Sequence, residues 1–316
     1  MNILVTAIGS MSGQCVITAL KKRGHRVIGC DIYPGEWHYE TTLCDNFYRA
    51  PFATSKAYIP FLLEVVKKEL VDFVIPLTDV EVDALVANRD CFKNSGATLC
   101  ISDSETIAIA RNKFKLFQFL EREHFPAIPS YHSEAKLTLS QFKDFPYFAK
   151  PCNGRSSEGV VRVEKPEVLE LILHKKNYLI QEIKDDNHIY TVDVLRQAWS
   201  DEVVLVPRRE LLRTSNGAGL TVQLSNSEEL KALTLRIARK LNVNGCVNME
   251  FIYDDNCYYL IDVNPRFSAG VGFSQLTGND FVNGHLACFW GKERLAKIHP
   301  YQESILVKRD IETVIG

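Results

Sequence analysis

The sequence lacks the features that would point to a membrane, a zinc centre or a nucleic acid. No apolar stretch approaches the roughly 20 residues that a membrane-spanning helix needs. None of the nine cysteines forms a C-x-x-C pair, the spacing typical of zinc sites. The 37 basic residues are balanced by 39 acidic ones, so no basic excess indicates a nucleic-acid partner. We therefore expect a cytoplasmic protein with reduced thiols that binds neither membranes nor nucleic acids.

The first third of the chain alternates apolar runs with amphipathic segments. The runs at residues 3–7, 26–30, 71–76 and 98–101 predict strands, and residues 59–68 predict one of the intervening helices. This alternation favours an α/β domain with a parallel, doubly wound sheet. The first run has no basic region before it, which indicates an opening strand and not a signal peptide.

The rest of the chain divides into two parts where the pattern changes. A helix, a proline-containing linker and a mixture of strands with one further helix are predicted for residues 105–185. Residues 186–316 are richer in predicted strands, with one helix at residues 228–241 among them. We therefore predict three domains, at residues 1–104, 105–185 and 186–316, the last of α+β type.

The loop after the first predicted strand partly matches a dinucleotide-binding fingerprint. Gly9 and Gly13 lie in this loop, and Asp31 ends the next strand, where an acid binds a ribose in such sites. The complete G-x-G-x-x-G spacing is absent. The residues leave two alternatives open: a nicotinamide site that serves an oxidoreductase, or a turn with a structural or substrate-facing role.

Two apolar strands near the end of the chain each carry one carboxylate. Glu250 lies in the run 247–253, and Asp262 lies in the run 258–263. The acidic turn 254–256 between the runs predicts a hairpin, in which the two carboxylates can face the same side. Buried carboxylates are costly unless they are paired or bind a metal, and two neighbouring ones repel each other.

Asn264 supplies a third oxygen on the same side of the hairpin, because it lies two residues beyond Asp262. Hard oxygen ligands of this kind favour Mg²⁺, so we predict a metal site at Glu250, Asp262 and Asn264. Arg266 follows on the same face, where a guanidinium can pair with a phosphate. The alternative from the residues alone is a surface hairpin with solvated acids.

Together these residues resemble the ATP-grasp superfamily, in its branch similar to the carbamoyl-phosphate synthase large chain. The family motif has an acid on one strand and E-x-N-P-R on the next, which matches Glu250 and the run Asp262-Val263-Asn264-Pro265-Arg266 with aspartate in place of glutamate. The resemblance implies a Rossmann-like pre-ATP-grasp domain followed by a two-lobed ATP-grasp fold. It also implies ATP and Mg²⁺ as cofactors, with Mn²⁺ as a substitute for Mg²⁺.

The resemblance further implies which residues hold the nucleotide. Lys113 and Lys150 match the two family lysines that contact phosphates as point charges. The phosphate-covering loop of the family matches residues 152–159, which implies nucleotide contacts from Gly154, Arg155, Ser156, Ser157 and Gly159. Taken alone, each lysine is more typical of a solvated surface and the loop of an ordinary hairpin.

The adenine-binding strand of the family implies contacts from Gln181, Glu182 and Ile183. One position departs from the family pattern, because Ile189 stands where a ribose-binding glutamate is usual. An isoleucine cannot hydrogen-bond a hydroxyl, so we expect His188 or Glu182 to take over the ribose contact.

The remaining expectations concern the reaction. In relatives, the strand around Arg208 and the turn after Arg266 face the transferred phosphate and the acceptor, which implies catalytic roles for Arg208, Arg266 and Ser268. The implied reaction joins a small-molecule carboxylate to an amine or a thiol through an acyl phosphate, releasing ADP and phosphate. The alternatives are a phosphorylating reaction like that of carbamoyl-phosphate synthase and non-catalytic ATP binding. Homodimers are common among relatives.

Overall fold

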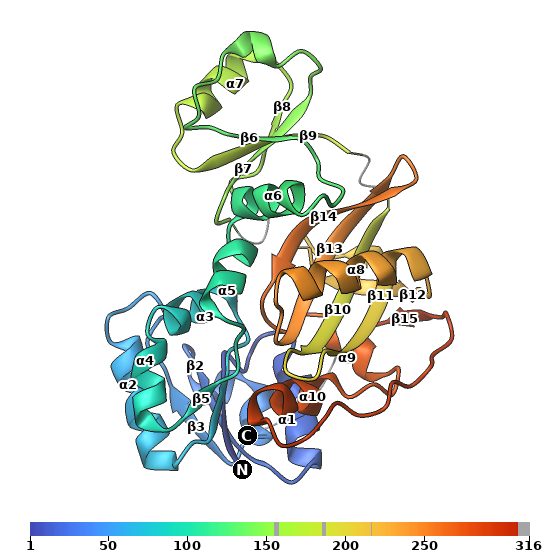
Figure 1. Ribbon diagram of the computed structural model, residues 1–316. Coiled ribbons are helices and arrows are strands. Elements are labelled where there is room, and N and C mark those ends of the chain that lie inside the picture. Colours follow the sequence, from blue (N-terminus) through green and yellow to red (C-terminus); the bar gives the residue numbers. More distant parts are fainter. Residues whose placement is uncertain (155–157, 185–187, 216, 309–316) are drawn as a thin grey trace.

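The computed structural model describes residues 1–154, 158–184, 188–215 and 217–308. These residues form one parallel sheet and two antiparallel sheets (Figure 1). The parallel sheet and the larger antiparallel sheet lie in the body of the molecule, and the small sheet stands apart from them at one end. The predicted α/β fold with an α+β C-terminal part is confirmed. Each sheet falls within one of the three predicted domains, whose boundaries at residues 104 and 185 stay predictions.

The N-terminal sheet is parallel throughout, with the strand order β3-β2-β1-β4-β5 of a doubly wound fold. Apolar side chains fill both of its faces, under α1 on one side and under α2, α3 and α4 on the other. Its elements are β1 (Asn2–Thr6), α1 (Gly13–Lys22), β2 (Arg26–Asp31), β3 (Asn46–Arg49), α2 (Tyr58–Glu69), β4 (Phe73–Ile75), α3 (Asp79–Val86), α4 (Arg89–Ser95) and β5 (Thr98–Leu99), with short 3₁₀ turns at Gly35–Trp37 and Tyr39–Thr42.

A small lobe follows, built on a four-stranded antiparallel sheet in the order β6-β9-β7-β8. Two helices connect it to the N-terminal domain, and a third covers its small apolar core. Its elements are α5 (Ser104–Ala110), α6 (Lys113–Arg122), β6 (Ser130–His132), the 3₁₀ turn Leu139–Gln141, β7 (Tyr147–Pro151), β8 (Val161–Val163), α7 (Pro166–Leu173) and β9 (Tyr178–Glu182).

The large lobe contains a six-stranded antiparallel sheet in the order β14-β13-β10-β11-β12-β15. Helix α8, which Ser227 caps, packs on one face of this sheet, and α10 packs on the other. Its elements are β10 (Ile189–Gln197), β11 (Glu202–Arg213), β12 (Gly219–Leu224), α8 (Glu228–Lys240), β13 (Gly245–Asp254), β14 (Cys257–Asn264), α9 (Val271–Gln275), α10 (Phe281–Trp290) and β15 (Ile305–Val307).

The predicted strands of the N-terminal domain and the C-terminal hairpin are present, but four strands were missed. β3, β6 and β15 lie at sheet edges, and β12 pairs with the edge strand β15. Edge strands bury fewer side chains, so their sequences carry weaker apolar patterns.

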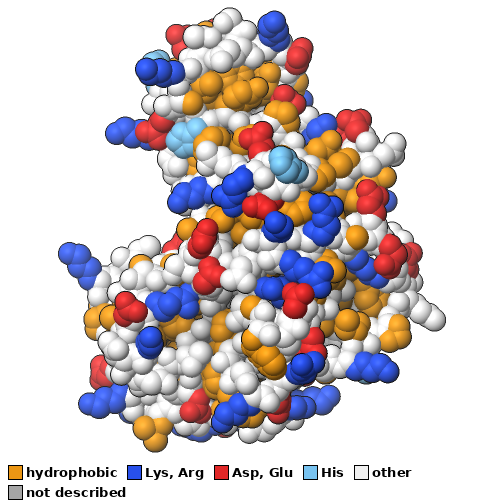
Figure 2. Space-filling model, viewed as in Figure 1, with side chains coloured by type: hydrophobic (Ala, Val, Ile, Leu, Met, Phe, Trp, Pro, Cys, Tyr) orange, Lys and Arg blue, Asp and Glu red, His pale blue; other side chains and the backbone are white. Residues whose placement is uncertain are grey.

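The predicted free thiols are confirmed, since all nine cysteines are unpaired. Basic and acidic side chains mix over the face in view in Figure 2, and no helix of the described part is long and apolar enough to cross a membrane.

The N-terminal domain and the large lobe meet at a joint that is apolar inside and ionic at its edge. One buried cluster combines Val5 of β1 with Phe267 and Val271, which follow β14. Beside it, Arg266 donates a forked pair of hydrogen bonds to Asp79, from Nε to Oδ1 at 3.1 Å and from Nη2 to Oδ2 at 2.9 Å. This bidentate geometry fixes the angle between the two domains more firmly than a single contact would.

The charge of Asp79 is stabilised by its arginine neighbours. Burial alone would raise the pKa of Asp79, but the nearby charges of Arg266 and Arg111 outweigh burial and leave the pKa below its ordinary value. A carboxylate with a lower pKa in the folded state stabilises the fold above its ordinary pKa. That stabilisation is lost as the pH falls through the folded-state value.

Replacing Asp79 should therefore weaken the joint in a pH-dependent manner. We expect Asp79→Asn to lower the free energy of unfolding by about 2–3 kcal/mol at pH 7, because the forked pair to a charged partner is lost. The difference from wild type should begin to shrink as the pH falls below about 4, the ordinary pKa of an aspartate, and should be lost below the lower folded-state value. Urea unfolding at pH 7 and below about pH 4 measures this difference in the free energy of unfolding. Asp83→Asn, on the same helix, also removes a forked pair, with Arg111, but the Asp83 side chain is half-exposed whereas Asp79 is buried. It should therefore cost clearly less than Asp79→Asn; equal losses would contradict the expectation.

Candidate active site

The hairpin of β13 and β14 brings the three predicted metal ligands together. Its antiparallel register places Glu250 opposite Asp262 and Asn248 opposite Asn264. Directly opposed residues point to the same face of a sheet, so the carboxylates and the amide share one side. The pairing becomes irregular immediately after Glu250. The hairpin itself is confirmed, and the metal role of the three residues stays a prediction.

Two cations neutralise these carboxylates in the described structure. Lys113 Nζ donates to both oxygens of Asp262 at 3.0 Å, and Arg213 Nη2 donates to Glu250 Oε1 at 2.5 Å. Burial nevertheless raises the pKa of Glu250, with Arg213 opposing the rise and Asp262 adding to it. Side chains or ligands that contact these two carboxylates must therefore supply positive charge.

The chemistry of the donor set fits a hard divalent cation. Carboxylate and amide oxygens are the ligands that Mg²⁺ prefers, usually with only one or two protein carboxylates. Within the described residues, no three His, Cys, Asp or Glu side chains form a metal-binding group, so the set depends on two acids and Asn264. The amide nitrogen of Asn264 donates to Asn248 at 3.4 Å, and its oxygen accepts from Arg266 at 3.3 Å.

A cavity of about 270 Å³, which we call the lysine cavity, lies between the small lobe and this hairpin. Lys113 and Lys150 line it together with both acids, and their implied contacts with nucleotide phosphates stay predictions. Its other walls are largely apolar, from Ile128, Phe148, Pro151, Val160, Ile189, Ile252 and Ile261. A flat apolar ring with a charged tail would match this lining.

The two lysines are held in different ways. Lys113 begins α6, whose first turn is capped by the side chain of Asn112, and it reaches both Asp262 and the carbonyl oxygen of Gly154. Lys150 lies on β7, where burial first and then the charge of Lys113 lower its pKa to about 8. An anionic ligand in the cavity would restore the charge of Lys150.

The segment predicted to cover the phosphates, residues 152–159, is described only at its ends. Gly154 lies at the wall of the lysine cavity, and Gly159 adopts the left-handed backbone conformation that favours glycine. The predicted contacts at Arg155, Ser156 and Ser157 lie outside the described residues.

Strand β9 and the residues after it contribute to the lysine cavity some of the residues predicted to contact the nucleotide base, and one unpredicted residue. Gln181 and Glu182 line the lysine cavity, whereas Ile183 is half-buried outside its lining and His188 is exposed outside it. Lys184, which the sequence analysis missed, also lines the cavity and pairs with two acids of the hairpin turn. Glu182 is therefore better placed than His188 for the ribose contact, which stays a prediction.

A second cavity of about 690 Å³, the polar cavity, lies on the other side of the two acids. It shares four lining residues with the lysine cavity, Glu158, Arg213, Glu250 and Asp262. The three predicted catalytic residues Arg208, Arg266 and Ser268 also line it. The two cavities thus meet at the predicted metal ligands.

The arginines of the polar cavity already have protein partners. Arg208 is fully buried and donates to Asp193 at 2.7 Å, to Ser268 at 3.2 Å and to Glu210 at 3.3 Å. Arg266 holds Asp79 at the joint between domains. These arginines therefore hold neighbouring protein side chains in place. Their predicted contacts with a phosphate stay predictions.

The N-terminal loop faces the polar cavity, not a dinucleotide site. Ser10, Met11 and Ser12 line the cavity. The carboxylate of Asp31, which a nicotinamide site would need for a ribose, accepts instead from the backbone N–H of Gly9 at 3.0 Å. Of the two alternatives left open by the sequence, this geometry favours the substrate-facing turn.

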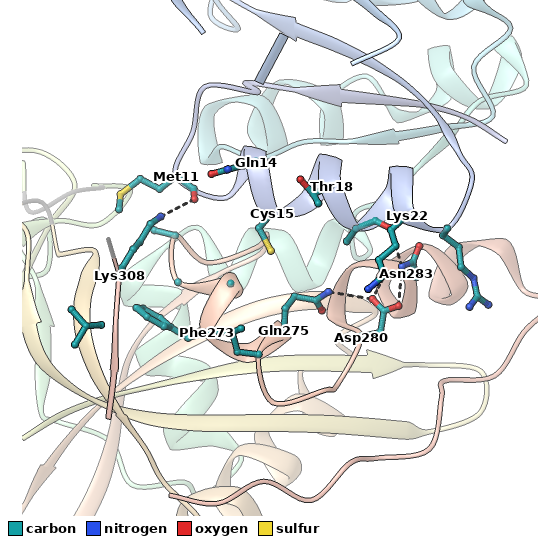
Figure 3. A pocket seen from close by; sticks show the side chains of 17 residues that line it. Met11, Gln14, Cys15, Thr18, Lys22, Phe273, Gln275, Asp280, Asn283 and Lys308 are labelled. Carbon is teal, nitrogen blue, oxygen red and sulfur yellow. Dashed lines mark hydrogen bonds between the residues drawn. The ribbon is translucent and has the colours of Figure 1, made fainter. Parts of the chain in front are cut away.

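A third cavity of about 840 Å³, the helix cavity, adjoins the polar cavity at Met11, Ala269 and Gly270. Figure 3 shows it between α1 and the segment that carries Phe273 and Asp280, with the thiol of Cys15 directed into it. Burial raises the pKa of this thiol to about 11, so it stays protonated near neutral pH and is not an activated nucleophile.

The lowered pKa of Lys150 predicts a pH-dependent nucleotide affinity. Lys150 is cationic below about pH 8 and neutral above it, so its attraction for phosphates is lost as the pH rises. Without metal ion, ADP binding measured by calorimetry should weaken above about pH 8, by at most about tenfold per pH unit for one linked proton. Lys150→Arg, which stays charged, should flatten the profile. A profile unchanged by Lys150→Arg would assign the titration to another group.

Two family models match the chain. Residues 3–100 match the model described as PylC-like, N-terminal domain, and residues 175–313 match the model described as ATP-grasp in the biosynthetic pathway with Ter operon. The arginine-specific carbamoyl phosphate synthase large chain of Bacillus subtilis is 20% identical over 269 residues, which cover 81% of this chain. The match spans only 25% of that relative.

Solved structures share the fold over nearly the whole chain. The biotin carboxylase domain of 2-oxoglutarate carboxylase from Hydrogenobacter thermophilus, a dimer in complex with MgADP, ADP and bicarbonate, aligns with a TM-score of 0.76 at 16% identity, covering 93% of this chain and 70% of that one. N5-carboxyaminoimidazole synthetase from Staphylococcus aureus, complexed with ADP, aligns with a TM-score of 0.73 at 12% identity, covering 97% and 79%. The chain thus combines a PylC-like N-terminal domain at residues 3–100 with an ATP-grasp domain at residues 175–313.

Proposed function

We propose that the protein is an ATP- and Mg²⁺-dependent ligase that joins a carboxylate to an amine and releases ADP and phosphate. The meeting of the lysine and polar cavities at Glu250 and Asp262 carries this proposal. A nucleotide in one cavity and an acceptor in the other would bring a terminal phosphate and a carboxylate to the same two acids. Transfer between two anions requires such a shared, charge-compensated position.

The lysine cavity supplies the nucleotide contacts. Its apolar walls would pack on the adenine ring, and the backbone of Gln181 and Glu182 would meet the edge of the base. Lys113 and Lys150 would attract the phosphates. Glu250, Asp262 and Asn264 would hold Mg²⁺, which offsets phosphate charge in such sites and can be replaced by Mn²⁺.

The polar cavity supplies the acceptor contacts. A free carboxylate is a poor acyl donor, because its leaving group would be oxide, whereas an acyl phosphate releases phosphate easily. Arg208 and Ser268 would orient the acceptor, and the N-terminal loop at Ser10 would close the cavity from the other domain. The amine would then attack the acyl carbon and displace phosphate. Enclosure between the lobes would protect the acyl phosphate from water.

Several features of the relatives support parts of this proposal. The solved structures contain ADP or MgADP, and one contains bicarbonate, itself a small carboxylate-like acceptor.

The helix cavity offers room for the non-reacting part of a larger acceptor. We further propose that the protein works in the cytoplasm, where ATP and reduced thiols coexist, and forms a homodimer, since one of these neighbours is a dimer.

Removing a predicted metal ligand tests the proposal. Wild-type protein with Mg-ATP should release ADP in the presence of some member of a panel of amino acids and sugar acids paired with amines. Glu250→Gln should lower that rate about a hundredfold or more, because several kcal/mol of charge stabilisation is lost. Glu228→Gln, a solvent-exposed glutamate of α8, should keep the wild-type rate.

Two results would contradict the proposal. If ATP binds but no acceptor of the panel elicits ADP release, and Glu250→Gln changes nothing, the protein is a non-catalytic nucleotide-binding module. If NAD raises the melting temperature and Mg-ATP does not, the N-terminal domain carries a dinucleotide site after all.

A further inference from the structure

The helix cavity is a groove that follows one face of α1. Its residues from α1 and from the turn before it, Met11, Cys15, Thr18 and Lys22 among them, recur at the spacing of three and four that places side chains on one side of a helix. Figure 3 shows α1 across from the segment that carries Phe273. A helix of ten residues is about 15 Å long, so the groove continues about that far from the polar cavity.

The groove opens into the polar cavity beside the residues proposed to orient the acceptor. Met11, Ala269 and Gly270 line both cavities. Gly270 lies directly against Arg208, since a Cβ built at Gly270 would come to 3.0 Å from Nη2 of Arg208. An acceptor oriented by Arg208 and Ser268 would therefore have an open path into the groove.

Large apolar side chains are exposed in the walls of this groove. Leu276 is 74% exposed, Val307 68% and Met11 39%, and Phe273 adds a largely buried ring. Exposed apolar side chains that gather in one concave surface are typical of a ligand site. An apolar ligand would remove these side chains from water.

The charges of the groove favour an acid over an amine. Three cations, Lys22, Arg23 and Lys308, line it against one carboxylate, that of Asp280. Cations remain in excess even when Glu293, which lies 3.8 Å from Arg23, is counted with the acids. A positive surface attracts an anionic substrate. Of the two substrates of the proposed reaction, the carboxylate is therefore the one that suits the groove.

We propose that the groove along α1 binds an elongated apolar tail of the carboxylate substrate, while the carboxylate itself lies in the polar cavity. The inference rests on the proposed ligase function and specifies the class of acid that the site prefers. An extended chain advances about 1.2 Å per bond, a third of the span of an extended residue, so a tail of about 10–12 bonds would fill the groove. Lys22 and Arg23 are exposed to water at its far end, so a longer tail would gain nothing there.

A length series of acids tests the inference. In the presence of saturating MgADP, melting temperatures are measured with straight-chain monocarboxylic acids of about 2–14 carbons and with alkylamines of the same lengths. Each added methylene should tighten acid binding about two- to fourfold, because apolar surface leaves water, until the tail fills the groove. The amines should show no such gain.

Two variants test whether the tail lies in this groove. A Cβ at Gly272 would meet no atom within 4 Å, and the residue is not left-handed, so Gly272→Leu adds a side chain where the groove has open space. It should abolish the gain per methylene and leave the MgADP shift unchanged. Leu276→Ser should weaken the affinity for the longest acids about threefold or more. Leu171→Ser removes a leucine of similar exposure, 68%, from α7 outside the three cavities and should behave as wild type.

The outcomes separate the inference from the proposed function. If MgADP stabilises the protein but affinity does not rise with the length of the acid, or rises with the length of the amine instead, the inference is wrong and the nucleotide site stands. A gain per methylene that persists in Gly272→Leu would also contradict it, because the tail would then bind elsewhere. If MgADP itself gives no shift, the proposed function fails.

A second copy of the chain is the other candidate for covering this groove. If Gly272→Leu and Leu276→Ser change the oligomeric state measured by light scattering and not the binding of acids, the groove is an interface between copies and the inference is wrong. If Gly272→Leu does not fold, the length series and the comparison of Leu276→Ser with Leu171→Ser still decide.

Discussion

The repulsion between two facing carboxylates on one hairpin governs the rest of the site. Glu250 and Asp262 are neighbours across β13 and β14, and neither is free in solvent. Two like charges in such a place are tolerated only if cations surround them. The fold meets this requirement from distant parts of the sequence, with Lys113 from the helix entering the small lobe and Arg213 from the end of β11. The same requirement makes the position suitable for phosphates that arrive with a divalent ion.

This requirement also explains how the lobes are arranged. The small lobe supplies lysines to one side of the acids, and the N-terminal domain supplies a polar loop to the other. Each of these two cavities is lined by residues from more than one part of the chain, so neither would be complete in an isolated domain. Chemistry that depends on excluding water is well served by walls that can separate and close.

Much of the fold could be predicted from the sequence, because buried strands and amphipathic helices leave periodic patterns. The carboxylates at 250 and 262 were visible as charges inside apolar runs. Lys113 and Lys150 were singled out only through the family resemblance, since a lysine at the start of a helix or on a short strand looks like any surface lysine. Asp79 was missed because its partner is 187 residues away. Such pairings depend on tertiary packing, for which local sequence carries no pattern.

The forked pair of Asp79 and Arg266 links the domain joint to the predicted metal ligands. Arg266 also donates to the side-chain oxygen of Asn264, so one guanidinium touches both the N-terminal domain and a residue of the donor set. A change in the angle between the domains would therefore displace the hydrogen-bonded side chain of Asn264. A ligand that alters this angle would change the affinity of the site for its ion. By thermodynamic reciprocity, the ion would change the affinity for that ligand by the same factor. The joint would therefore couple the proposed ion to any ligand that changes the angle between the domains.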